Sequence, residues 1–395
     1  MRSSRALRSL PEPFRKTPPL RRLDLAMNQP LRKDGTATLR SLDQTESPLV
    51  REFREVLETA VRRSGRKRIV VLTHKTPDPD ALGAAAGVQR LISGGFGLEA
   101  EVSTTGRIFR AENLAMVREL SLYHTDQGDL DLDQYAGGVL VDSQPGFGHT
   151  EIPSGLEILG VFDHHVSPDE AATEAIPHSD IRTKLGATSS LVYEYLRDAG
   201  VELDTQTATS LFCGVRYDTG DLSHNVTDLD EEAYFETLRR ADRQKVARIQ
   251  RPRLPQDYFK ELHRSLRMAR RYGPAVVAML GHVKNPESVA EMADFFLRME
   301  GSLWSFVGGA FEDQYYVSLR TRFGTTDAYG LLEQLLAGEG SFGGHGSVSG
   351  GRVALEQGEK LAVRRLERRL RARVLKTLDP NGTLDEESRQ GKTLT

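Results

Sequence analysis

The chain has 395 residues, of which 38% are hydrophobic and 28% charged, a composition typical of folded globular proteins. Lys and Arg number 53 against 56 Asp and Glu, so the formal net charge of −3 excludes a chain-wide positive field for nucleic acid. The single cysteine, Cys213, excludes a disulfide framework and a zinc site built from cysteines. Because its neighbours are apolar, we expect a buried core thiol there.

The N-terminal region is basic. Its first 40 residues carry ten Lys and Arg against three Asp and Glu, with several prolines and no apolar segment of a secretory signal. Residues 1–48 therefore predict a disordered basic arm, or a start assigned too far upstream of Met27, with nucleic-acid binding by the arm as an alternative. No stretch approaches the roughly 18 apolar residues of a membrane span, so we expect a cytoplasmic protein.

Strands and helices alternate over residues 49–235, which we interpret as the first domain. Apolar residues at helical spacing or in short runs predict the elements. Helices are expected over residues 50–64, 81–93, 111–120, 187–199 and 206–217, and strands over residues 68–73, 98–104, 139–142 and 158–163. This alternation predicts an α/β fold with a doubly wound, mostly parallel sheet.

A charged segment over residues 236–257 is expected to be a linker, helical at first, that leads to a smaller α/β domain over residues 258–377. The expected strands cover residues 275–280, 303–311 and 315–322, and the expected helices cover residues 286–298, 327–336 and 359–377. The strands 303–311 and 315–322 form a hairpin, which predicts a mixed sheet. Residues 338–351 are interpreted as a glycine-rich loop and residues 378–395 as a flexible tail, and a cleft is expected between the two domains.

Side chains that bind metals follow several of the expected strands. His74, Asp78 and Asp80 come directly after the apolar run 69–72, and Asp142 closes the run 139–142. Further donors stand at the ends of later elements, at Asp163, His164, His165 and Asp218. Because the carboxyl ends of parallel strands meet at one edge of an open α/β sheet, we expect these groups to share one site.

This mixture of carboxylates and imidazoles suits Mn²⁺, Mg²⁺ or Fe²⁺ better than metals that prefer sulfur. Two such ions about 3.5–4 Å apart can share a carboxylate and clamp a phosphate oxygen while a hydroxide attacks phosphorus. Each residue alone has an ordinary structural interpretation, since an aspartate at a strand end is usually a turn or helix-capping residue. Only their common place in the fold favours a metal site.

These segments resemble the DHH phosphoesterase superfamily, which is named for a triplet that stands here as Asp163-His164-His165. The family's first motif, His-x-x-x-Asp-x-Asp-Ala-x-Gly, matches residues 74–83, and its Gly-x-x-x-Asp-Thr-Gly motif matches residues 214–220. Residues 186–190, which open an expected helix, also look like the family. Pro79 stands where many members have glycine, which excludes a backbone N–H contact there but leaves the ligands unchanged.

The resemblance implies two divalent cations, with Mn²⁺ as the first choice and Mg²⁺ or Fe²⁺ as alternatives. It assigns the first ion to His74, Asp78 and Asp142. It assigns the second ion to Asp80, Asp142, His164 and Asp218, so that Asp142 bridges the pair. It further implies that His165 lies beside the substrate phosphate and stabilises charge there, and that Asp163 orients the adjacent histidine.

The C-terminal segment resembles the DHH-associated domain, whose Gly-Gly-Gly-His motif stands here as residues 342–345 with Phe342 as its first member. The preceding strand resembles the family's Ser-x-Arg strand at Ser318 and Arg320. The resemblance implies that the substrate is bound by Arg320, Gly343, Gly344 and His345. The helix over 359–377 carries six arginines above an expected apolar stripe of Leu361, Leu366, Leu370 and Val374. We interpret the arginines as a solvated face, with steering of an anionic substrate as the alternative.

The compact layout resembles the nano-RNase branch, the bifunctional oligoribonuclease and 3′-phosphoadenosine 5′-phosphate phosphatase type. It implies hydrolysis of short oligoribonucleotides or linear dinucleotides to mononucleotides, and of 3′-phosphoadenosine 5′-phosphate, by a hydroxide that two metals activate. Other activities of the superfamily, on pyrophosphate, a cyclic dinucleotide or single-stranded DNA, stay open, as does a nucleotide-binding module without catalysis. Short RNA or a nucleotide is the expected partner, with no membrane and no stable protein partner; a homodimer is left open.

Overall fold

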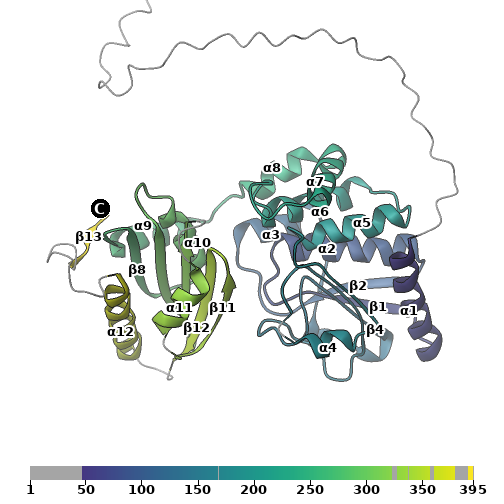
Figure 1. Cartoon of the computed structure of the whole chain (residues 1–395), viewed down its shortest axis with the longest axis horizontal. Coiled ribbons are helices and arrows are strands. Elements are labelled where there is room, and N and C mark those ends of the chain that lie inside the picture. The colour runs from purple at the N-terminus through teal and green to yellow at the C-terminus, as the bar shows by residue number, and fades with distance from the viewer. Residues whose placement is uncertain are drawn as a thin grey trace, which may run out of the picture. The chain divides into compact units, whose positions relative to one another are not determined.

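The computed structural model of the protein describes residues 47–167, 169–322, 327–336, 338–355, 360–378 and 390–394 (Figure 1). The predictions for the basic arm and for most of the flexible tail fall on residues outside these ranges. Within them, no helix is both long and apolar enough to cross a bilayer.

The first domain is built on a six-stranded sheet in which every neighbouring pair of strands is parallel. Its strands are β1 (Arg68–Leu72), β2 (Glu99–Thr104), β3 (Thr125–Asp126), β4 (Tyr135–Val141), β5 (Ile158–Asp163) and β6 (His178–Ile181). They lie in the order β3-β2-β1-β4-β5-β6, the order of a doubly wound sheet. The chain runs outward from β1 in one direction and from β4 in the other, so the strand order reverses between β1 and β4. The fold class predicted from the sequence is confirmed.

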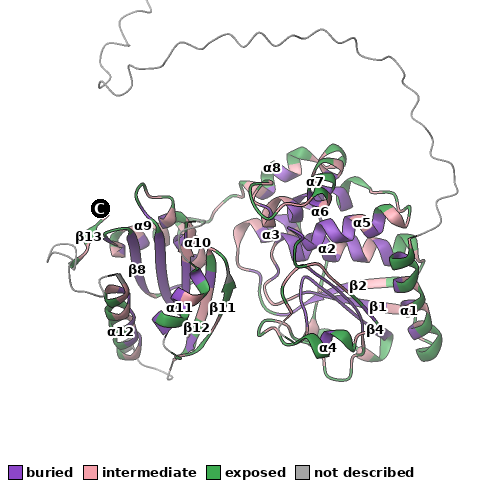
Figure 2. Cartoon of the chain, viewed as in Figure 1, coloured by how far each residue is buried: buried purple, intermediate pink, exposed green. Residues whose placement is uncertain are grey.

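The first domain also contains the helices α1 (Pro48–Ser64), α2 (Pro79–Arg90), α3 (Ala111–Glu119), α4 (Glu170–Glu174), α5 (Thr188–Asp198), α6 (Thr205–Asp218), α7 (Asp228–Arg240) and α8 (Arg243–Gln250). The helices cover one face of the sheet more fully than the other. Ile69 and Val71 of β1 pack in a core with side chains of α1, α2, α5 and α6, whereas Val70 and Leu72 face a smaller cluster completed by connecting segments. Figure 2 shows the buried inner sides of α2, α5 and α6.

Local signals set both ends of α1 and the start of α2. The side chain of Ser47 caps α1, Pro48 follows at its first position, and Gly65 ends it with a φ of 71°. Asp78 caps α2 in the same way and Pro79 takes the first helical position. The proline that departs from the family motif is therefore placed where its missing N–H would have no helical partner.

The second domain holds a seven-stranded mixed sheet in the order β11-β12-β10-β9-β8-β7-β13. Its elements are α9 (Gln256–Met268), β7 (Arg270–Tyr272), β8 (Ala275–His282), α10 (Glu287–Leu297), β9 (Trp304–Phe311), β10 (Gln314–Thr321), α11 (Ala328–Leu336), β11 (Ser341–His345), β12 (Val348–Ala354), α12 (Lys360–Leu378) and β13 (Lys392–Thr393). Among the described strands of this sheet, β8 and β9 are the one parallel pair. One face packs against α11 and α12 and the other against α9 and α10.

Three details of the sequence interpretation change. The sequence predicts a loop over residues 338–351, but these residues contain β11 and the start of β12; their glycines lie in an antiparallel hairpin, although glycine is usually depleted in strands. Leu361 is 62% exposed, and Val363 takes its place in the buried stripe of α12. Part of the expected linker, α8, buries Val246 and Ile249 against α3 and α6.

Candidate metal centre

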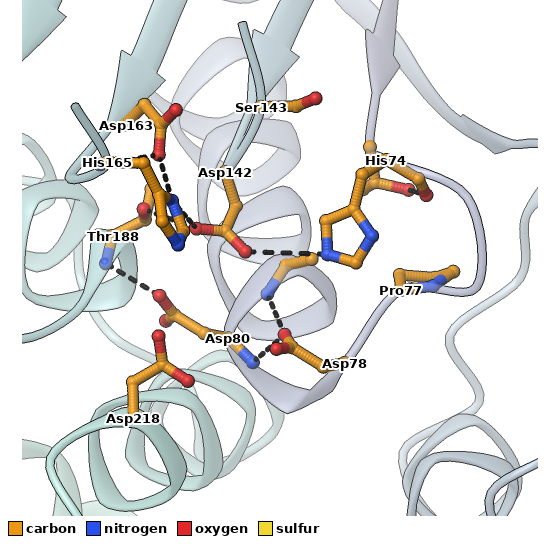
Figure 3. A network of polar contacts seen from close by, with 12 residues as sticks. His74, Pro77, Asp78, Asp80, Asp142, Ser143, Asp163, His165, Thr188 and Asp218 are labelled. Carbon is orange, nitrogen blue, oxygen red and sulfur yellow. Dashed lines mark hydrogen bonds and ion pairs between the residues drawn. The ribbon is translucent and has the colours of Figure 1, made fainter. Parts of the chain in front are cut away.

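Three neighbouring strands deliver polar side chains to one end of the parallel sheet. His74 follows β1, Asp142 follows β4, and Asp163 ends β5 and is followed by His164 and His165. Two helices complete the set, because Asp78 and Asp80 stand at the start of α2 and Asp218 is the last residue of α6. Figure 3 labels all of these residues except His164, and shows them around Asp142. The place is the reversal of strand order between β1 and β4, where open α/β sheets bind their ligands.

The donor atoms fall into overlapping groups in which all atoms lie within 4.8 Å of one another. These groups are His74, Asp78 and Asp142; Asp80, His164 and Asp218; and Asp142, His164 and His165. The first is the set predicted for one ion, and the second contains three of the four residues predicted for the other. Asp142 is the predicted bridge. Its Oδ2 lies 3.6 Å from Nε2 of His74, and its Oδ1 lies 3.8 Å from Nε2 of His164.

Backbone carbonyls fix the tautomers of two histidines. Nδ1 of His74 donates to the carbonyl of Lys75 at 2.7 Å, and Nδ1 of His164 donates to the carbonyl of Leu185 at 3.1 Å. Since a carbonyl can only accept, each Nδ1 carries the hydrogen and each Nε2 presents a lone pair to the carboxylates in the neutral form. Nε2 of His164 is buried without a hydrogen-bond partner among the described residues, although Oδ2 of Asp218 lies 3.2 Å away. An orphaned lone pair beside carboxylates fits a bound cation.

Asp142 occupies a strained and buried position. Its φ of 54° lies in the left-handed region, and only 3% of the residue is exposed. Oδ1 accepts a hydrogen bond from Oγ1 of Thr188 at 2.8 Å. Burial alone would raise the pKa of Asp142, but the neighbouring His74, His165 and His164 hold it well below its usual range. The carboxylate is therefore held ionised at the centre of the cluster.

Asp80 is fully buried and is held by the first turn of α5. Its Oδ2 accepts the backbone N–H of Thr188 at 2.7 Å, and its Oδ1 accepts that of Ser189 at 2.9 Å. The N-terminus of a helix favours negative charge, so the helix stabilises this carboxylate. Gly214 is required nearby, because a Cβ there would lie 2.8 Å from Oδ1 of Asp80 and 2.1 Å from Oγ of Ser189. This contact explains the glycine that opens the Gly-x-x-x-Asp-Thr-Gly segment.

Asp163 points its carboxylate at the third histidine. Oδ1 accepts hydrogen bonds from the backbone N–H of His164 at 2.7 Å and from the N–H of His165 at 3.2 Å, and lies 2.8 Å from Nδ1 of His165. Oδ2 accepts from Nε2 of Gln144 at 2.8 Å, and the same amide reaches the carbonyl of His165 at 2.9 Å. The geometry thus lets Asp163 and Gln144 orient His165.

The cluster carries more negative charge than its own histidines neutralise comfortably. Burial, followed by the charges of Asp218 and Asp142, raises the pKa of Asp78 to about 7. Burial also raises the pKa of Asp80 well above its usual value. Although burial lowers the pKa of His164, the nearby carboxylates of Asp218 and Asp142 raise it to about 11. The raised pKa values of Asp78 and Asp80 mean that these carboxylates are stabilised by any added positive charge. The oxygen and imidazole donors suit Mn²⁺, Mg²⁺ or Fe²⁺.

Sequence reasoning missed several residues that support this site. Thr188 contacts both Asp80 and Asp142, although the sequence singles out only its segment, and Gln144 carries no signal of its own there. Phe147 and His149, in the loop after β4, lie against the imidazoles of the cluster. Burial, with the charges of His74 and His165, lowers the pKa of His149 to about 4. Their place just after Asp142 is the signal that the sequence offers.

The residues predicted to bind substrate in the second domain lie on one corner of its sheet. Arg320 of β10 pairs with Val348 of β12, which pairs with His345 of β11; the side chain of His345 lies outside the described part of the structure. The guanidinium of Arg320 bonds Oδ1 of Asp294 at 2.6 Å and Oγ of Ser318 at 2.7 Å.

The two glycines of β11 that are predicted to bind substrate differ in their surroundings. A Cβ on Gly343 would meet nothing within 4 Å. Gly344 has a φ of 137°, and a Cβ there would lie 2.3 Å from the carbonyl oxygen of Val348. The fold therefore requires glycine at position 344 but not at position 343.

Comparisons with known proteins agree with this two-part organisation. Residues 68–215 match the family model described as DHH family, N-terminal domain, and residues 273–372 match the DHHA1 domain. An uncharacterized protein of Methanocaldococcus jannaschii is 28% identical over 348 residues, which are 86% of this chain and 70% of that protein. A probable bifunctional oligoribonuclease and PAP phosphatase NrnA of Streptococcus mutans is 27% identical over 163 residues, which are 40% of this chain and 48% of that protein.

Among solved structures, an exopolyphosphatase-related protein from Bacteroides fragilis superposes with a TM-score of 0.58. The match covers 81% of this chain and 96% of that chain, at 16% sequence identity. At this identity the match shows a shared fold.

Proposed function

Because this chain belongs to the DHH family, with a DHHA1 domain after its DHH domain, we propose that it is a metal-dependent phosphoesterase that hydrolyses short oligoribonucleotides or linear dinucleotides to mononucleotides. One observation carries the proposal: two donor groups, one for each ion, are linked by a third group that shares the buried Asp142 with one and His164 with the other. The similarity to a probable bifunctional oligoribonuclease and PAP phosphatase favours nucleotide substrates, and extends the proposal to 3′-phosphoadenosine 5′-phosphate.

His74, Asp78 and Asp142 would hold one divalent cation, and Asp80, Asp142, His164 and Asp218 would hold the other. When bound, two such cations supply an activated water molecule and neutralise charge on the phosphoryl oxygens. Mn²⁺ is the first candidate on the donor set.

The chain's own groups have distinct tasks in this proposal. His165, oriented by Asp163 and Gln144, stabilises charge on the phosphate from the side facing the loop after β4. Asp80 is kept in place by two backbone N–H groups of α5, so it needs no rearrangement during the reaction. In the second domain Arg320, Gly343, Gly344 and His345 bind the substrate at a phosphate remote from the one that is cut.

A substrate panel with the purified full chain and Mn²⁺ tests the proposal. The panel compares dinucleotides, five-residue oligoribonucleotides, longer single strands of RNA and DNA, 3′-phosphoadenosine 5′-phosphate, cyclic dinucleotides and pyrophosphate. We expect dinucleotides and five-residue RNAs to give mononucleotides fastest, with activity lost in chelator and restored by Mn²⁺. A protein that cleaves pyrophosphate or cyclic dinucleotides but no linear nucleotide would contradict the proposal, and one that binds nucleotides without cutting any would be a binding module.

A further inference from the structure

Two aromatic rings stand directly beside the imidazoles of the metal centre. The rings of Phe147 and His149 are stacked, with centroids 5.2 Å apart and planes at 12°. Each ring contacts one imidazole of the cluster in edge-to-face geometry. The ring centroids of His149 and His74 are 5.3 Å apart, and those of Phe147 and His165 are 6.0 Å apart. The pair therefore adds aromatic rings to the site, next to otherwise charged groups.

The loop that carries the rings is anchored to the end of β1. The backbone N–H of Lys75 donates to the carbonyl of His149 at 2.9 Å, and that of Thr150 donates to the carbonyl of Phe147 at 3.0 Å. The hydroxyls of Ser143 and Thr150 are also in contact. These bonds hold the stacked pair in a fixed relation to His74 without help from a ligand.

Packing does not explain Phe147. It is half-buried, and it belongs to none of the buried apolar clusters formed by the described residues. The next two residues, Gly148 and His149, are exposed, so this side of the loop faces solvent. A large aromatic side chain outside the core, fixed in place and next to a site for phosphoesters, is better suited to contact with a ligand.

We infer that the Phe147–His149 pair is a stacking surface for the nucleobase of one nucleoside joined to the scissile phosphate. The inference rests on the proposed function and deepens it, because it makes a nucleoside, rather than phosphate alone, the recognised unit. Aromatic side chains stack on any base, since every base has a π-face. The surface therefore selects nucleotides over pyrophosphate and tolerates different sequences.

The test replaces the ring and, separately, removes the base. Phe147→Ala removes the stacking surface, Phe147→Leu keeps most of the volume without a π-face, and Phe147→Trp keeps an aromatic ring. Tyr123→Ala is the matched control, because Tyr123 is an aromatic residue of the same domain that is 87% exposed and outside the site. Substrates are a dinucleotide and its two analogues with an abasic sugar at either position, assayed with Mn²⁺.

We expect Phe147→Ala and Phe147→Leu to raise KM for the dinucleotide about tenfold, with kcat little changed, and Phe147→Trp and Tyr123→Ala to resemble wild type. Wild type should show the same rise in KM with one of the two abasic analogues. On that analogue, Phe147→Ala should raise KM no further. A methylenephosphonate-linked dinucleotide that carries 2-aminopurine, titrated with Mg²⁺ present, should show the same change in Kd without turnover.

Two results would overturn the inference while leaving the proposed function standing. One is a wild-type KM for the dinucleotide in both Phe147→Ala and Phe147→Leu. The other is an equal loss of activity in Phe147→Ala on the dinucleotide and on both abasic analogues, which would mean that the ring only positions His165. If wild type cleaves no dinucleotide at all, the proposed function itself fails and this inference fails with it.

Discussion

The two regions that carry candidate functional residues differ in how far their polar groups are already satisfied. Around Asp142, buried carboxylates and imidazoles crowd together, and Nε2 of His164 has no hydrogen-bond partner among the described residues. Around Arg320, the guanidinium is bonded to Asp294, Ser318 and backbone carbonyls. The first region has an unmet need for positive charge, whereas the second needs no ligand to be stable.

This difference has a physical consequence. A buried group without a partner costs free energy, so the fold retains such a group only where something binds it or where it serves a purpose. Arg320 must exchange existing hydrogen bonds for those to a substrate, so its net contribution to binding is smaller. We therefore expect changes in the first region to abolish chemistry and changes in the second to weaken binding.

The largest expected effect comes from Asp142→Asn. Asparagine tolerates the φ of 54° and keeps the shape of the side chain, but it removes the charge shared by both predicted ions. Turnover with saturating Mn²⁺ should fall by more than the roughly 10- to 100-fold typical of partners outside the ligand set. Calorimetric titration should show weaker Mn²⁺ binding. Asp129→Asn, at an exposed aspartate, is the control; equal activity in the two variants would remove Asp142 from the site.

The second effect compares one glycine in each region. Gly214→Ala forces a Cβ against Ser189 and Asp80, and overpacking of this kind costs about 1–3 kcal/mol in the free energy of unfolding. Gly343→Ala meets nothing within 4 Å, so unfolding should change by less than about 0.5 kcal/mol. Urea unfolding of both variants measures the difference. Equal stabilities would show that the first region is less tightly packed than the contacts indicate.

Arg320→Ala should raise KM for the preferred nucleotide about tenfold and leave kcat unchanged, because it removes binding rather than chemistry. Asp294→Asn separates substrate binding from local structure. It weakens the ion pair that occupies the guanidinium, so KM should stay equal or fall. Steady-state kinetics of both variants decide the point. A rise in KM in both would show that the ion pair itself, rather than a free guanidinium, matters.

The smallest expected effect is that of Cys213→Ala, next to Gly214 but outside the polar cluster. Burial raises the pKa of Cys213 to about 12, so its thiol is neither a nucleophile nor a metal ligand at neutral pH. We expect turnover within about twofold of wild type and a loss of about 1 kcal/mol in unfolding free energy from the buried atom removed. A large loss of turnover at unchanged stability would contradict this interpretation.

Much of the fold could be predicted because its long elements carry clear periodicity. The strands at β1, β4 and β5 and the helices α1, α5 and α6 are all predicted, most of them with ends close to those of the structure, although β4 begins at Tyr135, ahead of the predicted run 139–142. The short strands β3, β6, β7 and β13 were missed, since two to four residues carry no detectable alternation. The hairpin of β11 and β12 was missed because glycine supplies no strand signal, and its register comes from pairing with β10.

The sequence by itself determined the candidate donors, because His74, Asp78 and Asp80 follow one apolar run, three further segments supply acids and imidazoles, and together they resemble the DHH motifs. Tertiary structure alone decided which groups support it. Thr188 contacts Asp80 and Asp142, Gln144 contacts Asp163, and Phe147 lies beside His165, because strand order brings distant segments to one sheet edge. Ligand type is a local property of residues, but orientation depends on contacts that only the packed chain creates.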